Sequence, residues 1–388
     1  IDSLLKFTRP KSRSMAKSDM TLTALLTPNY NGLDFIHREN SYNDFEREKL
    51  LLYKLSSQGP GIAVGDINGD GREDLWIGGA RDQSGITYLQ SATGQLLPLQ
   101  QHDLEAHAGF EDISGRWIDV DADRDLDLVV ISGGYQIDNP NILLDRVYFN
   151  DGHGNLTYDA AAMPAVSHMS SCIAPNDMDG DGDVDLFIGG RVAPYYGYNT
   201  DSYLLINDGK GHFSIDPDPI FKGLGMVTDA VWSSVDNSPR KDLLVCGEWM
   251  PITLLSHDGS RWSKRTIPNT EGLWQSISSV DLDGDGDEDL VAGNIGHNHD
   301  LRATAAHPAR MYVADFDQNT TPEAVISYYV QNQDYSFFSK DELAGEMVIL
   351  KKKYTDYHSF AQSRLDQVFV DLEKNPINKS VSQLASTI

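Results

Sequence analysis

Four short acidic segments carry the residues with the clearest chemical potential. They read DINGDGRED at 66–74, DVDADRDLD at 119–127, DMDGDGDVD at 177–185 and DLDGDGDED at 281–289. In each segment, acidic or amide side chains stand at positions 1, 3, 5 and 9, and position 7 can offer its backbone carbonyl. Alternate residues of a tight loop can direct their oxygens to one centre, and Ca²⁺ binds six to eight oxygens at about 2.3–2.6 Å. The pattern therefore predicts a calcium site in each loop.

The predicted ligands share these five loop positions. Loop by loop, they are Asp66, Asn68, Asp70, Arg72 and Asp74; Asp119, Asp121, Asp123, Asp125 and Asp127; Asp177, Asp179, Asp181, Asp183 and Asp185; and Asp281, Asp283, Asp285, Asp287 and Asp289. A weaker loop at 315–323, DFDQNTTPE, adds the candidates Asp315, Asp317, Asn319 and Glu323. We expect about four Ca²⁺ ions, with the weaker loop as a candidate for a fifth.

Position 6 of each loop needs a sharp turn, where a positive φ favours glycine. Gly71, Gly182 and Gly286 meet that need, whereas Arg124 and Thr320 occupy the position in the other two loops. Mg²⁺ ranks second because it demands stricter octahedral geometry. Zn²⁺ is disfavoured because the loops contain no histidine or cysteine. The remaining alternative is a set of Asp- and Gly-rich turns that bind nothing.

An EF-hand does not fit the four complete loops. It requires a glutamate at position 12 and helices on both sides. Position 12 is Ile77, Val130, Ile188 or Ala292, and the flanking segments are apolar and end in glycine. The loops therefore connect strands.

These strands must position the loops, and they recur along the chain. The repeating unit is an apolar strand, an acidic loop and a second strand, such as GIAVG before and LWIGGA after the first loop. The loop starts lie about 55 residues apart, and a copy without the acidic ladder occurs at 230–249. Hairpins around N-D-G-x-G turns are expected at 146–159 and 202–216. Units of this length with about four strands predict an all-β propeller of six to eight blades, with seven as the best estimate.

We divide the chain into four parts on this basis. Residues 1–58 form an N-terminal segment that partly joins the propeller, 59–335 the blades, 336–372 a helical insertion and 373–388 a C-terminal segment. Ser339 opens a capping box, and Leu343, Met347 and Leu350 follow at helical spacing. A second helix is expected at 355–369, with Phe360, Leu365 and Val368 on one face.

Composition excludes several functional classes. A formal net charge of −27 argues against nucleic acid and anionic membrane surfaces as partners. No apolar run reaches the ~18 residues of a membrane span. Cys172 and Cys246 each lie in an apolar stretch, which favours buried free thiols over a disulfide.

The loops and their flanking strands resemble FG-GAP/VCBS repeats, the blade repeats of the integrin α-subunit propeller and its bacterial relatives. The resemblance rests on GPGIAVGDINGDGREDLWIGGA, DMDGDGDVDLFIGGR and DLDGDGDEDLVAGNIG, and it covers roughly residues 34–369. FIHRENSYNDF, GEW and GNIGHN are similar to the bacterial ASPIC/UnbV and cartilage-acidic-protein-like group. The resemblance implies a seven-bladed propeller with calcium in the blade loops. It also implies an exported protein that is extracellular, periplasmic or on the outer cell surface, as part of a longer chain.

The first functional hypothesis is a binding or adhesion module for a protein or glycan. Aromatic side chains can stack on sugars or anchor a protein partner. The candidates are Tyr195, Tyr196, Tyr198 and Trp249, with Met250 and Tyr135 as further surface candidates. The alternative for each ring is packing between blades.

Two further hypotheses belong to other classes. A polysaccharide lyase or hydrolase would need an acid and a base in one pocket, and only Glu248, His297, His299 and His307 qualify. No serine-hydrolase, zinc-protease or nucleotide-binding signature supports an enzyme, so binding is favoured over catalysis and no catalytic residue is assigned. The third hypothesis is a scaffold within a larger surface protein.

Overall fold

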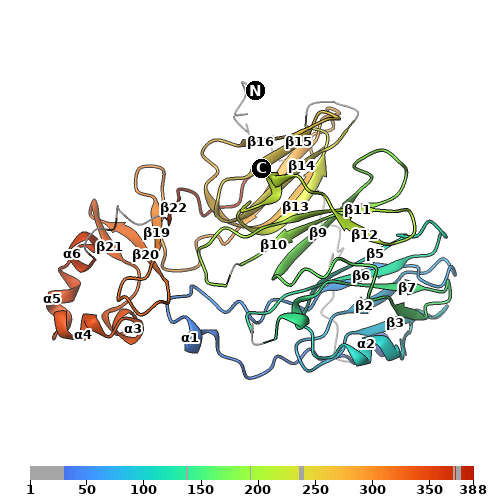
Figure 1. Cartoon of the computed structure of the whole chain (residues 1–388), viewed down its shortest axis with the longest axis horizontal. Coiled ribbons are helices and arrows are strands. Elements are labelled where there is room, and N and C mark those ends of the chain that lie inside the picture. The colour runs from blue at the N-terminus through green and yellow to red at the C-terminus, as the bar shows by residue number, and fades with distance from the viewer. Residues whose placement is uncertain (1–29, 137–138, 193, 236–239, 370–371, 373–376) are drawn as a thin grey trace, which may run out of the picture.

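A computed structural model describes residues 30–136, 139–192, 194–235, 240–369, 372 and 377–388. Antiparallel β-sheets dominate these residues, as the repeats predicted. Figure 1 shows successive sheets side by side, with a lobe of one further sheet and several helices at one end. The expected N-terminal segment at 1–58 and the acid-poor turn near 236 lie partly outside the described residues.

The first three sheets have four strands each, joined in chain order. Sheet one contains β1 (Ile62–Gly65), β2 (Asp74–Ile77), β3 (Ile86–Gln90) and β4 (Leu96–Leu99). Sheet two contains β5 (Asp112–Ile118), β6 (Asp127–Ser132), β7 (Arg146–Asn150) and β8 (Leu156–Tyr158). Sheet three contains β9 (Ser170–Asn176), β10 (Asp185–Gly190), β11 (Tyr203–Asn207) and β12 (Phe213–Ile215).

The next sheet has six strands and joins two repeats. It contains β13 (Met226–Ser233), β14 (Asp242–Met250), β15 (Thr253–His257), β16 (Trp262–Thr266), β17 (Gly272–Val280) and β18 (Asp289–Asn294). β14 pairs with β13 along most of its length, with β15 at Leu243–Val245, and with β17 only near its end, where Glu248 faces Leu273.

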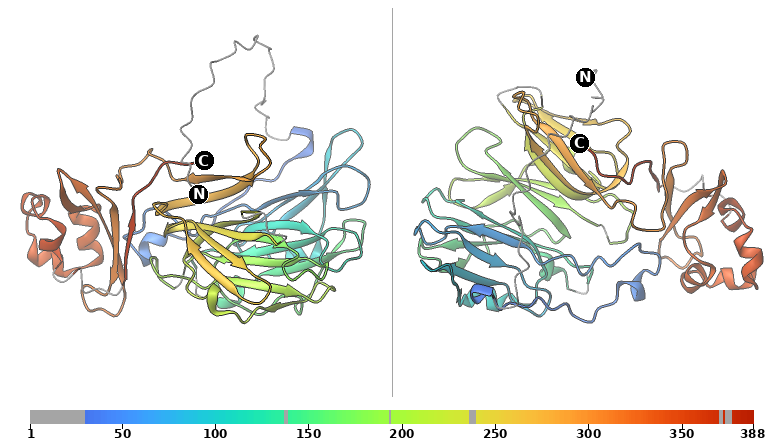
Figure 2. Two further views of the ribbon diagram at one scale, coloured as in Figure 1. Left: turned by 90° about the horizontal axis from the view of Figure 1, so that it is seen from above. Right: turned by 180° about the vertical axis from the view of Figure 1, so that it is seen from behind.

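The first strands of successive repeats lie beside one another. β1 contacts β5, β5 contacts β9, β9 contacts β13, and β13 contacts β17. This is the arrangement of propeller blades around an axis, and Figure 2 shows the sheets stacked in that order. The described residues form five sheets, so a closed ring of seven blades stays a prediction.

Apolar strands pack between neighbouring sheets and build the core. All six residues of β10 are buried because its two faces are covered by different sheets. On one face, Leu186 and Ile188 pack with Val129 and Ile131 of β6. On the other face, Phe187 packs with Val227 and Val245. Double coverage explains why β6 and β10, which follow the second and third acidic loops, are continuous apolar runs rather than alternating ones.

The lobe contains the last sheet and the helices of the C-terminal part. β19 (Ala309–Ala314), β20 (Glu323–Val330) and β21 (Gln333–Ser336) are joined by β22 (Ile377–Val381), which pairs with β19. Beside them lie α3 (Lys340–Glu346), α4 (Ile349–Lys353), α5 (Tyr357–Ala361) and α6 (Leu365–Val368). Figure 2 shows the helices beyond this sheet, at the end of the molecule. Shorter elements elsewhere are α1 (Asp44–Arg47), α2 (His102–Ala106), η1 (Tyr30–Gly32), η2 (Pro140–Leu143) and η3 (Pro219–Phe221).

The helices of the C-terminal part lie where the sequence predicted them, but they are shorter than predicted. Ser339 forms the predicted capping box with Glu342, yet the first helix breaks at Met347, whose backbone is extended. The predicted helix at 355–369 is two short helices, α5 and α6. Phe360 and Leu365 are five residues apart, and this spacing does not keep both side chains on one face of a single helix.

Other local predictions are confirmed. The two N-D-G-x-G turns connect β7 to β8 and β11 to β12 as hairpins. Their asparagines also link sheets: the Nδ2 amide of Asn150 donates to the carbonyl of Ile67 at 2.7 Å, and Asn207 does the same to Val120 at 2.8 Å. Cys172 and Cys246 are buried free thiols.

Candidate calcium loops and binding pocket

All five acidic loops wind around the carboxylate at position 1. In each, one oxygen of this aspartate accepts a hydrogen bond from the backbone N–H of position 6, at 2.7–3.1 Å. Position 6 has a positive φ in every loop, including Arg124 at 84° and Thr320 at 75°. Glycine is therefore not required for this turn, and the two loops that lack it adopt the same backbone as the others.

The carboxylate at position 9 fixes the loop through backbone hydrogen bonds. Asp74, Asp127 and Asp185 are buried, and each accepts two backbone hydrogen bonds. One comes from position 2 of the same loop and the other from the third strand of the sheet, for example from Val120 and Asn150 to Asp127 at 3.1 and 2.9 Å. Sequence reasoning predicted only a ligand role here. The structure adds a second role, because this carboxylate joins the loop to the third strand.

Oxygens of different positions also converge within the loops. One carboxylate oxygen from each member lies within 4.8 Å of the others in the following groups: Asp119, Asp121 and Asp127; Asp121, Asp123 and Asp125; Asp177, Asp179 and Asp185; and Asp281, Asp283 and Asp285. Ligand oxygens about 2.3–2.6 Å from a common ion can be no farther apart than roughly 5 Å. These groups therefore fit a Ca²⁺ ion.

Several loop oxygens are buried without a hydrogen-bond partner among the described residues. They are Asp119 Oδ1, Asp125 Oδ1, Asp183 Oδ1, Asp317 Oδ1 and Glu323 Oε1. A buried acceptor without a partner is costly, and a bound cation would satisfy it. The first loop differs, because the Arg72 guanidinium pairs with Asp70 there. That ion pair offsets part of the negative charge within the loop.

Burial raises the pKa of several loop carboxyl groups, and neighbouring carboxylates add to the effect. Burial raises the pKa of Asp127 to about 7, and the charges of Asp121 and Asp123 add to the effect. Burial likewise raises the pKa of Asp183 to about 6, followed by the charge of Asp181. Burial also raises the pKa of Glu323 to about 7. These groups hold protons near pH 6 that a divalent cation can replace.

We predict opposite pH effects on stability with and without calcium. A carboxyl group whose pKa is raised in the folded state stabilises the fold at a pH below its pKa in the unfolded chain, which is about 4. This stabilisation is lost as the pH rises through the folded-state pKa of about 7. In chelator, the urea concentration at the unfolding midpoint should therefore decrease as the pH rises from 4.5 to 7.5. In excess Ca²⁺ the fall should largely disappear. Equal slopes in both conditions would contradict a metal role for these carboxylates.

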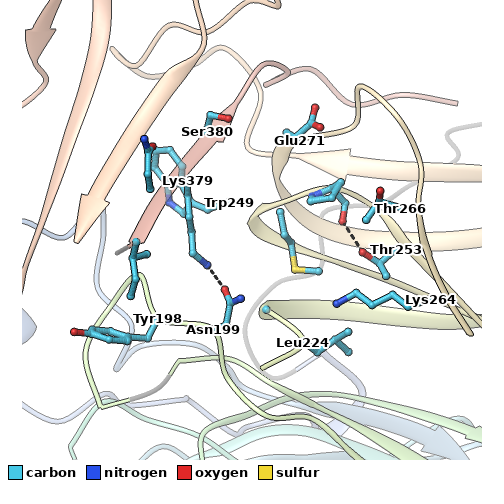
Figure 3. A pocket seen from close by; sticks show the side chains of 15 residues that line it. Tyr198, Asn199, Leu224, Trp249, Thr253, Lys264, Thr266, Glu271, Lys379 and Ser380 are labelled. Carbon is cyan, nitrogen blue, oxygen red and sulfur yellow. Dashed lines mark hydrogen bonds between the residues drawn. The ribbon is translucent and has the colours of Figure 1, made fainter. Parts of the chain in front are cut away.

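A polar pocket of about 670 Å³ lies between β22 and the sheet of β14–β16. Figure 3 shows Lys379 of β22 on one side and Lys264 of β16 on another, with Tyr198 nearby. Nζ of Lys379 donates to Oδ1 of Asn199, and burial lowers the pKa of this lysine to about 8. The pocket thus combines aromatic rings, hydroxyl groups and two ammonium groups in a strongly acidic protein.

A buried polar network supports Trp249 at the edge of this pocket. Glu248 is fully buried and accepts hydrogen bonds from Arg191 and Tyr196, each at 2.7 Å. The indole Nε1 of Trp249 donates to the Tyr196 hydroxyl at 3.0 Å, and Trp249 has a positive φ of 56°.

The structure separates the sequence candidates for ligand binding. Tyr198, Trp249 and Met250 line the pocket, and of these only Tyr198 is partly exposed, since Trp249 and Met250 are buried. Tyr196 and Tyr135 are buried and bond to Glu248 and Glu48. Tyr195 packs against Arg47. Sequence reasoning missed Lys264, Lys379 and Asn199, because they come from three distant segments. β22 reads INKSV, with three polar residues in a row, so no local pattern marked it as a strand beside a pocket.

The candidates for an acid–base pair do not form one. Glu248 is enclosed by its partners, so it presents no carboxylate to a substrate. His299 bonds through Nε2 to the carbonyl of Gly296 at 2.8 Å, and His307 packs against Tyr329. His297 has no contact with Glu248 among the described interactions.

The repeats match a known protein family. A sequence model of the FG-GAP-like repeat matches residues 66–130 and 119–188. Residues 66–188 contain FG-GAP-like repeats. This stretch spans the first three acidic loops, from β2 to most of β10, so the strand–loop–strand unit described above is the FG-GAP-like unit. No curated protein matches the chain.

Several solved structures are similar to this chain at low sequence identity. The Vibrio cholerae biofilm matrix protein Bap1 is 14% identical with a TM-score of 0.34, over 72% of this chain and 38% of Bap1. A putative exo-β-1,3-galactanase from Bifidobacterium bifidum s17 is 12% identical with a TM-score of 0.35, over 73% and 92% of the two chains. BBS1N, solved in complex with ARL6DN, is 12% identical with a TM-score of 0.32, over 74% and 93%. Among the described residues, none of the helices is long and apolar enough to cross a membrane.

Proposed function

We propose that this chain is a calcium-stabilised binding module of an exported or cell-surface protein. The observation that carries the proposal is the set of FG-GAP-like loops with converging oxygens, some of them buried without a partner. Calcium would join the loop to the strands on either side and hold the sheets in register. The finer architecture, a seven-bladed ring with an ion in each complete loop, belongs to this proposal.

The proposed ligand is a glycan or a protein segment that docks in the pocket of Tyr198 and Trp249. A pocket of about 670 Å³ is within the range typical of small-molecule and sugar sites. The ring of Tyr198 can stack on a sugar ring or an aromatic side chain, and the hydroxyl and amide groups of the pocket can bond to polar substituents. The enclosed position of Glu248 supports binding rather than catalysis.

We predict that Tyr198→Ala weakens ligand binding at least ~10-fold, since a central aromatic anchor contributes roughly 1.5–3 kcal/mol. The folded chain in excess Ca²⁺ is first screened on an array of neutral and acidic polysaccharides, and the affinity for the strongest binder is then measured by calorimetry. Tyr195→Ala is the matched control, because Tyr195 is a half-buried neighbour that does not line the pocket. Binding by no polysaccharide on the array, or equal losses in both variants, would argue against the glycan form of this proposal.

A further inference from the structure

A cluster of one histidine and two carboxylates lies at the opposite end of the sheets from the acidic loops. The segment before β1 crosses the first sheet at the β2–β3 turn. Gln83 fixes it there, since its Oε1 accepts from the N–H of Arg38 at 2.8 Å and its Nε2 donates to the carbonyl of Ile36 at 2.9 Å. Tyr88 donates its hydroxyl to Asp34 at 2.7 Å. The segment is therefore held in place by side chains of the first sheet.

This segment brings a histidine and two carboxylates together. His37, Glu39 and Glu111 each place one possible ligand atom within 4.8 Å of the others. Nε2 of His37 lies 2.8 Å from Oε1 of Glu39. Glu111 comes from a different element, directly before β5, so the cluster joins the N-terminal segment to the second sheet.

Two atoms of the cluster are buried and lack a hydrogen-bond partner among the described residues. Glu111 is only 5% exposed; its Oε2 accepts from the N–H of Arg81 at 2.9 Å, while its Oε1 accepts nothing. The Nδ1 atom of His37 is also without a partner. Leaving such groups unsatisfied costs free energy, and a cation bound by the cluster would satisfy the free oxygen of Glu111.

The charged neighbours of Glu111 are Glu39, Asp112 and Arg81. The Asp112 carboxylate is already paired with Arg146 at 2.6 Å, and the Arg81 guanidinium bonds to Gln136. Among the described residues, no donor forms a hydrogen bond with Oε1 of Glu111.

An imidazole with two carboxylates suits a transition metal better than calcium. Neutral imidazole is a good ligand for Zn²⁺, and carboxylate oxygens bind it at about 2.0–2.2 Å. Ca²⁺ selects oxygen ligands alone. Three protein ligands would leave a coordination position for water or a substrate group. We propose that His37, Glu39 and Glu111 bind a divalent transition metal ion, with Zn²⁺ as the best match.

The site is independent of the calcium loops. β5 runs seven residues from Asp112 to Ile118, which is roughly 20 Å of extended strand, and the loop at 119–127 follows its other end. Filling one site therefore does not require the other, and the inference goes beyond the binding role proposed above.

The test is Zn²⁺ titration of the full chain by calorimetry in saturating Ca²⁺, which keeps the acidic loops filled. We expect one Zn²⁺ to bind to the wild-type chain. His37→Ala and the isosteric Glu111→Gln should weaken it at least ~100-fold, since losing even an outer-shell partner of a metal site costs 10–100-fold. Co²⁺ should give the visible absorption of a site of low coordination number, and this absorption should be absent in both variants.

His102→Ala is the matched control, because His102 is an exposed histidine on α2, outside the cluster. It should retain wild-type Zn²⁺ affinity. Circular dichroism in Ca²⁺ establishes that each variant is folded, and if His37→Ala is not, Glu111→Gln decides the question. No Zn²⁺ binding by the folded wild-type chain, or equal affinity in wild type and Glu111→Gln, would overturn the proposal.

Discussion

Replacing Arg191 with methionine should lower the free energy of unfolding by about 3–5 kcal/mol, because it leaves a buried carboxylate without its cation. Arg191 and Glu248 are both almost completely buried, and their side chains meet at 2.7 Å. Arg191 also bonds to the Tyr53 hydroxyl at 3.1 Å, so the pair joins the N-terminal segment to β14. Removing only the cation costs far more than the pair contributes when intact.

Urea unfolding of the full chain in excess Ca²⁺ measures this loss. Arg261→Met is the control, since Arg261 and its partner Asp258 are largely exposed and such pairs contribute less than about 1 kcal/mol. Adding Glu248→Gln to Arg191→Met removes the uncompensated charge and should recover part of the stability. A loss below about 1 kcal/mol for Arg191→Met would contradict the buried pair.

The Asp179→Ala substitution should destabilise the chain in calcium and hardly at all in chelator. Asp179 stands at position 3 of the third loop and is exposed, and its Oδ1 accepts from the N–H of Asp181 at 3.1 Å. Its carboxylate lies with those of Asp177 and Asp185. A ligand at 100 times its dissociation constant stabilises the fold by about 2.7 kcal/mol, and most of this should be lost with one ligand removed.

Asp208→Ala separates a metal role from a turn role. Asp208 is also exposed, and it accepts hydrogen bonds from the backbone of Lys210 and His212 in the β11–β12 turn. The loss of stability caused by Asp208→Ala should therefore be the same with and without calcium. Both variants are compared by urea unfolding at pH 7.5 in excess Ca²⁺ and in chelator. If Asp179→Ala behaves like Asp208→Ala, the third loop is a turn and not a metal site.

The repeating parts of the fold could be predicted because their signals are local. An apolar run after each acidic segment predicts a strand, and the N-D-G-x-G turns predict hairpins; the structure contains both. The capping box at Ser339 was also local and correct. The spacing of the loops indicated the repeat, which the FG-GAP-like match at 66–188 supports.

The remaining features depend on tertiary contacts that no local pattern encodes. Asp127 stabilises its loop through Asn150, 23 residues away, and Glu111 meets His37 only because Gln83 fixes the intervening segment. Arg124 adopts a positive φ that its residue type disfavours, because the N–H at that position bonds to Asp119. The pocket requires β22 to pair with β19, although a long segment with four helices, α3 to α6, lies between them in the sequence.

Thermal unfolding of the full chain in excess Ca²⁺ and in chelator tests the central claim, that the acidic loops hold calcium, most directly. If several loops are filled at well above their dissociation constants, the melting temperature in Ca²⁺ should exceed that in chelator by ~10 °C or more, and Mg²⁺ at the same concentration should give a much smaller rise. Equal melting temperatures in Ca²⁺ and chelator would show that the loops are turns without a metal and would contradict the account.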